Sequence, residues 1–159
     1  MLLYLKGRVE LLNRPGFAIV GSRNATPQGE ANAEAFAAAL AEAGLTVVSG
    51  LALGIDAAAH RGALAATGDK AGSTIAVIGT GANRVYPARN QELARVIAQQ
   101  GVILSEFPLD TPALAANFPR RNRLIAGLSQ GCLVVEAAAR SGSLITARLA
   151  AEAGRDVFA

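Results

Sequence analysis

The chain has 159 residues, of which 52% are hydrophobic and 17% are charged, and its formal net charge is +3. This composition excludes a disordered chain and is sufficient for one domain with a sizeable core. A lone cysteine, Cys132, and a lone histidine, His60, exclude an internal disulfide and any metal site built on several of these residues. No apolar run is long enough to span a membrane and no signal peptide is recognisable, so we expect a cytoplasmic protein.

Arginine is the dominant basic residue, because Lys6 and Lys70 are the only lysines. The guanidinium group is a planar fork of donors that suits phosphate groups. Codon usage in a GC-rich genome also favours arginine and alanine, so the bias has two explanations. The mild positive charge permits a polyanionic partner without requiring one.

Short apolar runs alternate with longer alanine-rich runs along the chain. Gly21 ends the first apolar run, and Thr26 followed by Pro27 is typical of a helix N-terminus. In chain order the pattern predicts strand 17–20, helix 27–43, strand 45–48, helix 55–66, strand 74–78, helix 90–99, strand 102–105, an extended loop over 107–119, helix 121–128, strand 133–135, helix 143–153 and a last strand from 156 to 159.

This alternation predicts an α/β fold with a doubly wound, mostly parallel sheet and helices on both of its faces. The strands are nearly continuous apolar runs, as expected of strands that are buried on both faces. We expect residues 1–159 to form a single domain. The chain ends inside the last predicted strand, which we interpret as a truncation at the C-terminus.

Ligands of open α/β sheets bind beyond the carboxyl ends of the strands, so the residues after each strand are candidates. Here these turns combine glycine with serine or arginine, as in Gly21-Ser22-Arg23 and Arg140-Ser141-Gly142-Ser143. Glycine lets backbone N–H groups approach an anion, and helix N-termini direct partial positive charge at it. Glycine also ends strands for purely geometric reasons, which is the alternative for each single turn. The sequence contains neither the dinucleotide fingerprint nor a Walker A motif.

The densest basic cluster is Phe118-Pro119-Arg120-Arg121-Asn122-Arg123, which we place at the N-terminus of a predicted helix. A helix N-terminus with three arginines favours a phosphate ligand, and Phe118 beside them can stack on a base. The alternatives are a solvated basic turn and a Phe118 side chain that is buried in the core. The candidate ligand-contacting residues are Gly21, Ser22, Arg23, Gly50, Gly54, Gly79, Gly81, Phe118, Arg120, Arg121, Asn122, Arg123, Ser141, Gly142 and Ser143.

Candidate catalytic groups are sparse in this sequence. Glu106 and Glu136 follow strands and can form a carboxylate pair, although we favour the alternative that they pair with nearby arginines. Asp56 is expected in the first turn of a helix, where the helix dipole favours an acidic residue. His60 is expected at the surface or half-buried, and Cys132 in the core. We therefore predict a binding protein with no catalytic residues, no metal and no cofactor.

Several motifs follow one another along nearly the whole chain. They are Ala18–Arg23, Ser49–Asp56, Ala59–Arg61, Ala76–Gly81, Tyr86-Pro87, Ser105–Pro108, Phe118–Ser129, Val135–Ala137 and Ser141–Leu144. Together they resemble the DNA-processing protein A family, also called Smf. So many matches in one order make the resemblance specific.

The resemblance implies a Rossmann-like domain that binds single-stranded DNA and forms homodimers. It also implies a bacterial protein that helps to load the RecA recombinase during natural transformation and homologous recombination. By this resemblance, Gly21-Ser22-Arg23 and residues 118–123 hold the DNA backbone. Family members usually carry a small N-terminal helical domain and often a C-terminal winged helix, and we expect neither within these 159 residues.

Two alternative functions use the same fold. One is a phosphoribohydrolase of the lysine-decarboxylase-like fold, which splits a nucleoside monophosphate into base and ribose phosphate. That family carries a Pro-Gly-Gly-x-Gly-Thr loop followed by a glutamate, whereas here Glu136 precedes the Ser141-Gly142-Ser143 turn and the double-glycine loop is absent. The other is a non-catalytic nucleotide sensor that binds at the same edge of the sheet.

Overall fold

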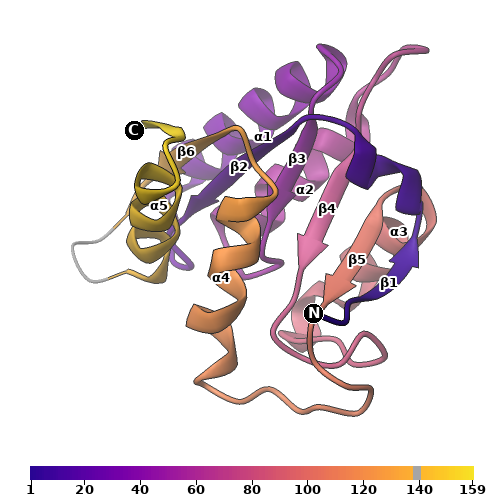
Figure 1. Ribbon diagram of the computed structural model, residues 1–159. Coiled ribbons are helices and arrows are strands. Elements are labelled where there is room, and N and C mark those ends of the chain that lie inside the picture. Colours follow the sequence, from indigo (N-terminus) through magenta and orange to yellow (C-terminus); the bar gives the residue numbers. More distant parts are fainter. Residues whose placement is uncertain (138–140) are drawn as a thin grey trace.

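The computed structural model describes residues 1–137 and 141–159. Within them, seven strands form one sheet in the order β1-β5-β4-β3-β2-β6-β7 (Figure 1). The strands are β1 (Tyr4–Gly7), β2 (Gly16–Gly21), β3 (Thr46–Ser49), β4 (Thr74–Val77), β5 (Val102–Ser105), β6 (Gly131–Val135) and β7 (Asp156–Phe158). Neighbouring strands are parallel except β1 and β5, which are antiparallel. The prediction of a doubly wound, mostly parallel α/β sheet is confirmed.

Helices cover both faces of this sheet. In Figure 1, α1 (Pro27–Glu42), α2 (Ile55–Ala65) and α3 (Gln91–Gln100) lie behind it, and α4 (Asn117–Gly127) and α5 (Gly142–Glu152) lie in front. Short 3-10 turns span Val9–Asn13 and Ala88–Asn90. Successive side chains of one strand point to opposite faces of the sheet and so pack in different cores. Ile19 packs with the alanines of α1 and α2, whereas Val20 packs with residues of α4 and α5.

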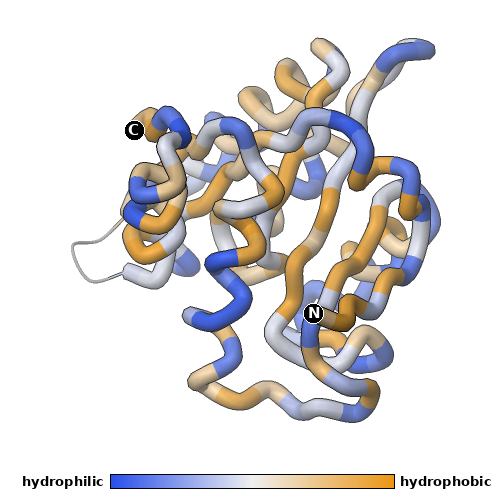
Figure 2. The backbone as a smooth tube through the Cα atoms, viewed as in Figure 1, coloured by the Kyte–Doolittle hydropathy of each residue, from blue (hydrophilic) through white to orange (hydrophobic). Residues whose placement is uncertain are grey.

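The central strands are apolar because both of their faces are covered. Every residue of β3, β4 and β5 is buried, and Figure 2 shows hydrophobic strands at the centre of the fold. α1 begins where the sequence predicts it. Thr26 Oγ1 accepts a hydrogen bond from the Gly29 N–H at 3.1 Å, and Pro27 occupies the first helical position.

Two elements differ from the predicted pattern. β1 is four residues long and mostly exposed, and half of it is Lys6-Gly7, so the predicted pattern lacks this edge strand. α4 begins at Asn117 rather than near Arg121, inside the segment predicted as a loop. Pro119 is compatible with this start because proline is tolerated in the first turn of a helix. The basic cluster of residues 118–123 therefore occupies the first two turns of α4.

The strand order reverses between β2 and β6. From β2 the chain moves stepwise through β3, β4 and β5 towards one edge, and then crosses through α4 to β6 on the other side of β2. The carboxyl ends of β2 and β6 lie side by side, with Gly21 paired to Val135. Such a reversal leaves a crevice outside the carboxyl ends of the strands, which is where ligands bind in doubly wound folds.

Candidate functional site

A cavity of about 370 Å³ opens at the reversal between β2 and β6, and we call it the switch-point cavity. The predicted contact residues that line it are Gly21, Ser22, Arg23, Phe118, Arg121, Asn122, Ser141, Gly142 and Ser143. Asp56 and Thr146 line it as well. The predicted residues outside its lining are Gly50, Gly54, Gly79, Gly81, Arg120 and Arg123. The fold thus gathers most of the predicted set around one cavity.

Arg23 is an exposed cation in the wall of the switch-point cavity. It follows β2 in a loop where the Ser22 hydroxyl oxygen accepts a hydrogen bond from the Asn24 N–H at 3.1 Å. Within residues 1–137 and 141–159, the Arg23 guanidinium has no ion-pair partner. Its charge is therefore available to an anion that enters the cavity.

The helical spacing of α4 separates its basic cluster into two groups. Phe118, Arg121 and Asn122 recur at positions i, i+3 and i+4, and all three line the cavity. Arg120 and Arg123 lie three residues apart on another face of the helix. The basic cluster of residues 118–123 is continuous in the sequence, but its side chains lie in two different environments, one at the cavity and one away from it.

Arg121 is buried, and its guanidinium satisfies carbonyl groups at the ends of two strands. Nη1 donates to Gly50 O at 2.7 Å and to Val77 O at 2.8 Å, and Nε donates to Asn122 Oδ1 at 2.9 Å. The Phe118 ring covers the group, with its centroid 5.6 Å from Cζ. The main contacts of Arg121 are thus internal, and they hold α4 against β3 and β4.

Asp56 is a buried carboxylate in the same cavity wall, in the first turn of α2 as predicted. Its Oδ2 atom accepts hydrogen bonds from the N–H groups of Gly50 at 3.1 Å and Ala52 at 3.4 Å. Burial raises the pKa of Asp56, and the nearby Arg121 guanidinium opposes this shift. The buried charges offset each other, so among the described lining residues the exposed positive charge comes from Arg23.

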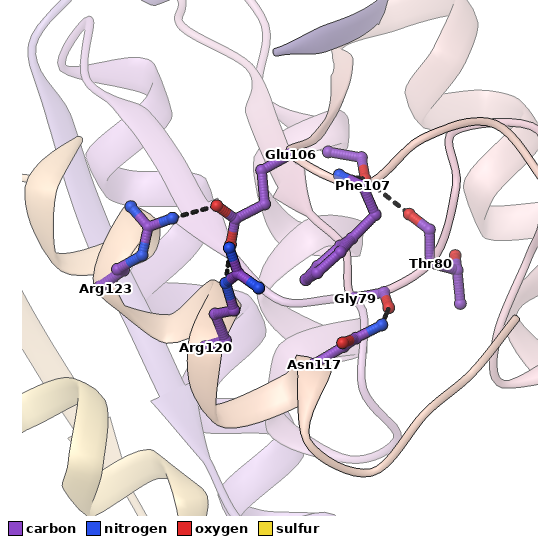
Figure 3. Close-up of polar contacts among 8 residues, drawn as sticks. Gly79, Thr80, Glu106, Phe107, Asn117, Arg120 and Arg123 are labelled. Carbon is purple, nitrogen blue, oxygen red and sulfur yellow. Dashed lines mark hydrogen bonds and ion pairs between the residues drawn. The ribbon is translucent and has the colours of Figure 1, made fainter. Parts of the chain in front are cut away.

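Glu106 pairs with both arginines on the other face of α4 (Figure 3). Its carboxylate forms an ion pair with Arg123, and its Oε1 atom lies 3.7 Å from Arg120 Nε. The Arg120 guanidinium also lies over the Phe107 ring, 5.7 Å from the centroid. The predicted pairing of Glu106 with arginines is confirmed. Two positive charges face one negative charge here, so the group keeps a net positive charge.

Phe118 lies between the switch-point cavity and a smaller cavity of about 70 Å³ that Tyr86 and Pro87 also line. The rings of Phe118 and Tyr86 are 5.4 Å apart between centroids and tilted by 41°. Phe118 is partly buried, whereas Tyr86 is 50% exposed. Tyr86 is absent from the predicted contact residues, and its only sequence signal is the Tyr86-Pro87 motif.

Most of the predicted glycines are required by close packing. A Cβ atom at Gly21 would overlap the Val135 carbonyl, and Gly54, with φ of +79°, lies against the Ser22 carbonyl. Overlaps with neighbouring atoms also occur at Gly50, Gly79 and Gly81. At these five positions, close packing of the backbone is therefore enough to explain why the residue is glycine. Gly142 differs, because the nearest described atom that its Cβ would meet lies 4.0 Å away.

α5 begins at the switch-point cavity with Ser141, Gly142 and Ser143. The hydroxyl oxygens of Ser141 and Ser143 are 2.6 Å apart, and Asn122 Nδ2 donates to Gly142 O at 3.3 Å. The first N–H groups of a helix lack intrahelical partners and attract anions. Arg140, which the sequence groups with this turn, lies outside the described residues.

In the described chain, Glu136 contacts the start of α1. Among the described residues it has no arginine partner. Its carboxylate instead accepts hydrogen bonds from the Thr26 N–H, at 2.8 Å, and from the Thr26 hydroxyl at the start of α1. These bonds lower the pKa of Glu136. The predicted pairing with nearby arginines is therefore not seen among the described residues, and Arg140 lies outside them.

His60 is fully buried, so its predicted place at or near the surface is wrong. Nε2 accepts a hydrogen bond from the Leu51 N–H at 3.2 Å, and Nδ1 lies 2.7 Å from Thr74 Oγ1. Thr74 donates its hydroxyl proton to Val47 O, so Nδ1 carries the imidazole proton. Burial lowers the pKa of His60 to about 3. Cys132 is buried as predicted, and burial raises the pKa of its thiol to about 11.

Metal and membrane sites find no support in the part of the chain that the structure describes. No group of three or more His, Cys, Asp or Glu residues there is arranged to hold a metal ion. No helix there is both long and apolar enough to cross a bilayer.

Comparison with known proteins identifies relatives over the whole chain. Residues 1–159 match the family described as DNA recombination-mediator protein A. Protein Smf of Escherichia coli (strain K12) is 51% identical over 158 residues, which are 99% of this chain and 41% of that protein. DNA processing protein DprA of Streptococcus pneumoniae (strain ATCC BAA-255 / R6) is 48% identical over 159 residues and 55% of its length. The chain spans about half the length of these relatives.

Solved structures of the same family share the fold. The X-ray structure of DprA from Streptococcus pneumoniae matches 98% of this chain and 53% of its own, with a TM-score of 0.89. A structure that describes the single-stranded DNA binding mode of DNA processing protein A from Helicobacter pylori is 36% identical, with a TM-score of 0.89 over 98% of this chain and 69% of its own. The family resemblance of the motifs is confirmed. The chain belongs to the DNA recombination-mediator protein A family.

Proposed function

We propose that this chain binds single-stranded DNA at the switch-point cavity. The observation that carries the proposal is the exposed Arg23 in the wall of a cavity that the N-terminus of α5 also borders. An arginine and the N–H groups of a helix N-terminus suit a phosphate. The sugar-phosphate backbone is the part of DNA that such groups recognise without regard to sequence.

The aromatic pair next to the cavity favours a single strand over a duplex. Phe118 presents ring surface to both cavities, and Tyr86 presents ring surface to the smaller one. Bases of a single strand are free to stack on such rings, whereas bases in a duplex already stack on one another. A recognition helix lying in a DNA groove is not needed for this mode of binding. The homologue from Helicobacter pylori, whose structure describes a single-stranded DNA binding mode, supports the same assignment.

A fluorescence anisotropy titration with single-stranded and duplex oligonucleotides of equal length tests the proposal. We expect tighter binding to the single strand and similar affinity for strands of different sequence. Equal or tighter binding to the duplex contradicts it. A mononucleotide that displaces the strand at micromolar concentration supports the nucleotide sensor instead.

We further propose that the longer protein helps to load RecA onto single-stranded DNA in natural transformation and recombination, as a homodimer in the bacterial cytoplasm. Membership of the recombination-mediator family supports this proposal. Residues 1–159 are proposed to act as its DNA-binding domain. The test is RecA nucleation on a single strand, measured with and without the full-length protein. An unchanged nucleation rate contradicts the mediator role.

We propose binding without catalysis. The acidic residue that the hydrolase alternative needs at the cavity is Glu136, and its carboxylate is engaged by Thr26 at the start of α1. Incubation with nucleoside monophosphates is expected to release no free base above buffer. A release that disappears in Glu136→Gln restores the enzyme as the better assignment.

A further inference from the structure

One residue holds both ends of the loop that carries Arg23, which we define as residues 22–26. The Ser22 N–H donates to the Glu136 backbone carbonyl at 3.1 Å. At the other end, the Thr26 N–H donates to Glu136 Oε2 at 2.8 Å, and the Thr26 hydroxyl donates to Oε1. Arg23 lies between these two attachments and makes no ion pair of its own in the described chain.

The surroundings of Glu136 are shaped to admit its carboxylate. A Cβ atom at Gly29, in the first turn of α1, would overlap the carboxyl group of Glu136. Glycine inside a helix costs about 1 kcal/mol relative to alanine, so this position is unfavourable for the helix alone. Glu136 itself has φ of +51°, a conformation that disfavours a non-glycine residue. An unfavourable residue type in α1 and an unfavourable backbone conformation at Glu136 thus coincide at the contact between the carboxylate and α1.

Helix capping alone does not account for this contact. Thr26 Oγ1 already accepts the Gly29 N–H and caps α1 by itself. The carboxylate adds a bond to the Thr26 N–H, which belongs to the end of the loop. It also occupies the N-terminus of α1, where doubly wound folds commonly bind a ligand phosphate. A phosphate held by Arg23 must therefore lie towards α5.

We propose that Glu136 is the positioning residue for Arg23: it fixes the 22–26 loop so that the guanidinium faces the switch-point cavity, and it closes the start of α1 to the strand. The inference rests on the proposed binding of single-stranded DNA. Under this proposal Glu136 strengthens the binding of a polyanion although its carboxylate is negatively charged. A negative charge beside a phosphate site acts in the opposite direction, because like charges repel.

Two variants separate the charge of Glu136 from its hydrogen bonds. Glu136→Gln removes the charge and keeps one acceptor oxygen for the Thr26 N–H, while its amide N–H group can donate to the Thr26 hydroxyl oxygen. Gly29→Ala keeps the charge and displaces the carboxylate from its place. Glu136→Ala removes both. Glu92→Ala is the matched control, because Glu92 is an exposed carboxylate on α3, on the opposite face of the sheet from α4 and α5.

We expect affinity for a single-stranded oligonucleotide to follow the hydrogen bonds. Glu136→Ala and Gly29→Ala should each weaken binding about fivefold, the ratio that corresponds to a typical lost capping interaction. Glu136→Gln should bind more tightly than Glu136→Ala, and Glu92→Ala should bind like the wild type. In an Arg23→Ala background, Glu136→Ala should cause little further loss. Tighter binding by both Glu136→Ala and Glu136→Gln overturns the proposal, because it makes Glu136 a repelling charge only.

Amide hydrogen exchange distinguishes failure of this inference from failure of the proposed function. The Thr26 amide should exchange faster in Glu136→Ala and Gly29→Ala than in Glu136→Gln, while amides of β3 keep their protection. If the wild-type chain binds no single strand, the proposed function fails whatever the exchange shows. If the wild type binds and Thr26 loses protection without loss of affinity, the positioning role alone is overturned. Unchanged Thr26 exchange in both variants overturns it as well.

Discussion

Within residues 1–137 and 141–159, a Cβ atom added at Gly142 would meet only Asn122, whose Nδ2 atom would lie 4.0 Å away. Gly142→Ala is therefore expected to keep the melting temperature of the wild type. If the backbone of this turn lies against a phosphate, the added methyl group weakens single-strand binding severalfold. Gly21→Ala is the contrasting variant and should lower the melting temperature strongly, since its Cβ would overlap Val135. Unchanged affinity in folded Gly142→Ala argues against backbone approach at α5.

Arg23→Ala should make binding less dependent on salt. For a single strand, the slope of log affinity against log salt changes by roughly 0.7 for each phosphate contact that is lost. Because Arg23 is exposed, the melting temperature should hardly change. Arg95→Ala, on α3 behind the sheet, is the matched arginine control. Equal slopes for Arg23→Ala and the wild type remove Arg23 from the phosphate contacts.

Arg123→Ala tests the arginines that pair with Glu106. The carboxylate already neutralises part of the charge of Arg120 and Arg123, so a phosphate contact here competes with the ion pair. We expect Arg123→Ala to change the salt slope by less than Arg23→Ala. Glu106→Gln should then tighten binding, because both guanidinium groups become available. A slope change in Arg123→Ala as large as in Arg23→Ala shows that the ion pair opens fully on binding.

Tyr86→Ala and Phe118→Leu test stacking. A base that stacks on an aromatic ring contributes roughly 1–3 kcal/mol, so each change should weaken single-strand binding by an amount in this range. Tyr86 is half exposed, and its loss should leave thermal stability near that of the wild type. Phe118→Leu keeps an apolar side chain against Gly79. Wild-type affinity in both variants assigns the ring of Phe118 to packing alone.

Acid should destabilise the fold through His60. Its folded pKa of about 3 lies below its unfolded value of 6.5, so the unfolded chain binds the extra proton between these values. The stabilising contribution is complete above pH 6.5 and is lost as the pH falls towards 3, with a slope approaching about 1.4 kcal/mol per pH unit. Asp56 acts in the opposite direction, because its raised pKa favours the folded state as the pH falls. Urea denaturation at pH 7 and 5.5 should therefore show a smaller loss in His60→Gln than in the wild type. Equal losses in both contradict the assignment.

The sequence predicts the architecture correctly where a residue's local role, such as helix capping, and its burial in the fold favour the same residue type. Residues 46–49, 74–77 and 102–105 are buried on both faces, and a strand of this kind is mainly apolar. Thr26 and Pro27 mark the start of α1 by a capping rule that acts within one turn. Once the parallel order is fixed, the carboxyl-edge rule brings Gly21-Ser22-Arg23 and Ser141-Gly142-Ser143 to one cavity.

The residues that sequence reasoning misplaces depend on partners distant in the chain. His60 precedes a charged residue and has no local sign of burial, yet its imidazole accepts a hydrogen bond from the Leu51 N–H and donates one to Thr74. The division of the basic cluster depends on where α4 begins, and Ala116 at its start provides no side-chain cap. Tyr86 meets Phe118 only because the loop after β4 and the start of α4 converge beside the cavity.

The switch-point cavity is assembled from segments that are far apart in the chain, since Ser22, Asp56, Arg121 and Ser143 each come from a different one. A peptide that contains only one of these segments cannot form it, so a ligand in the cavity binds the folded chain alone. Free ligand at 100 times its dissociation constant then raises the free energy of unfolding by about 2.7 kcal/mol. Proteases that cleave unfolded chains meet fewer of them under these conditions. Occupancy of the cavity is thus expected to slow proteolysis of the chain.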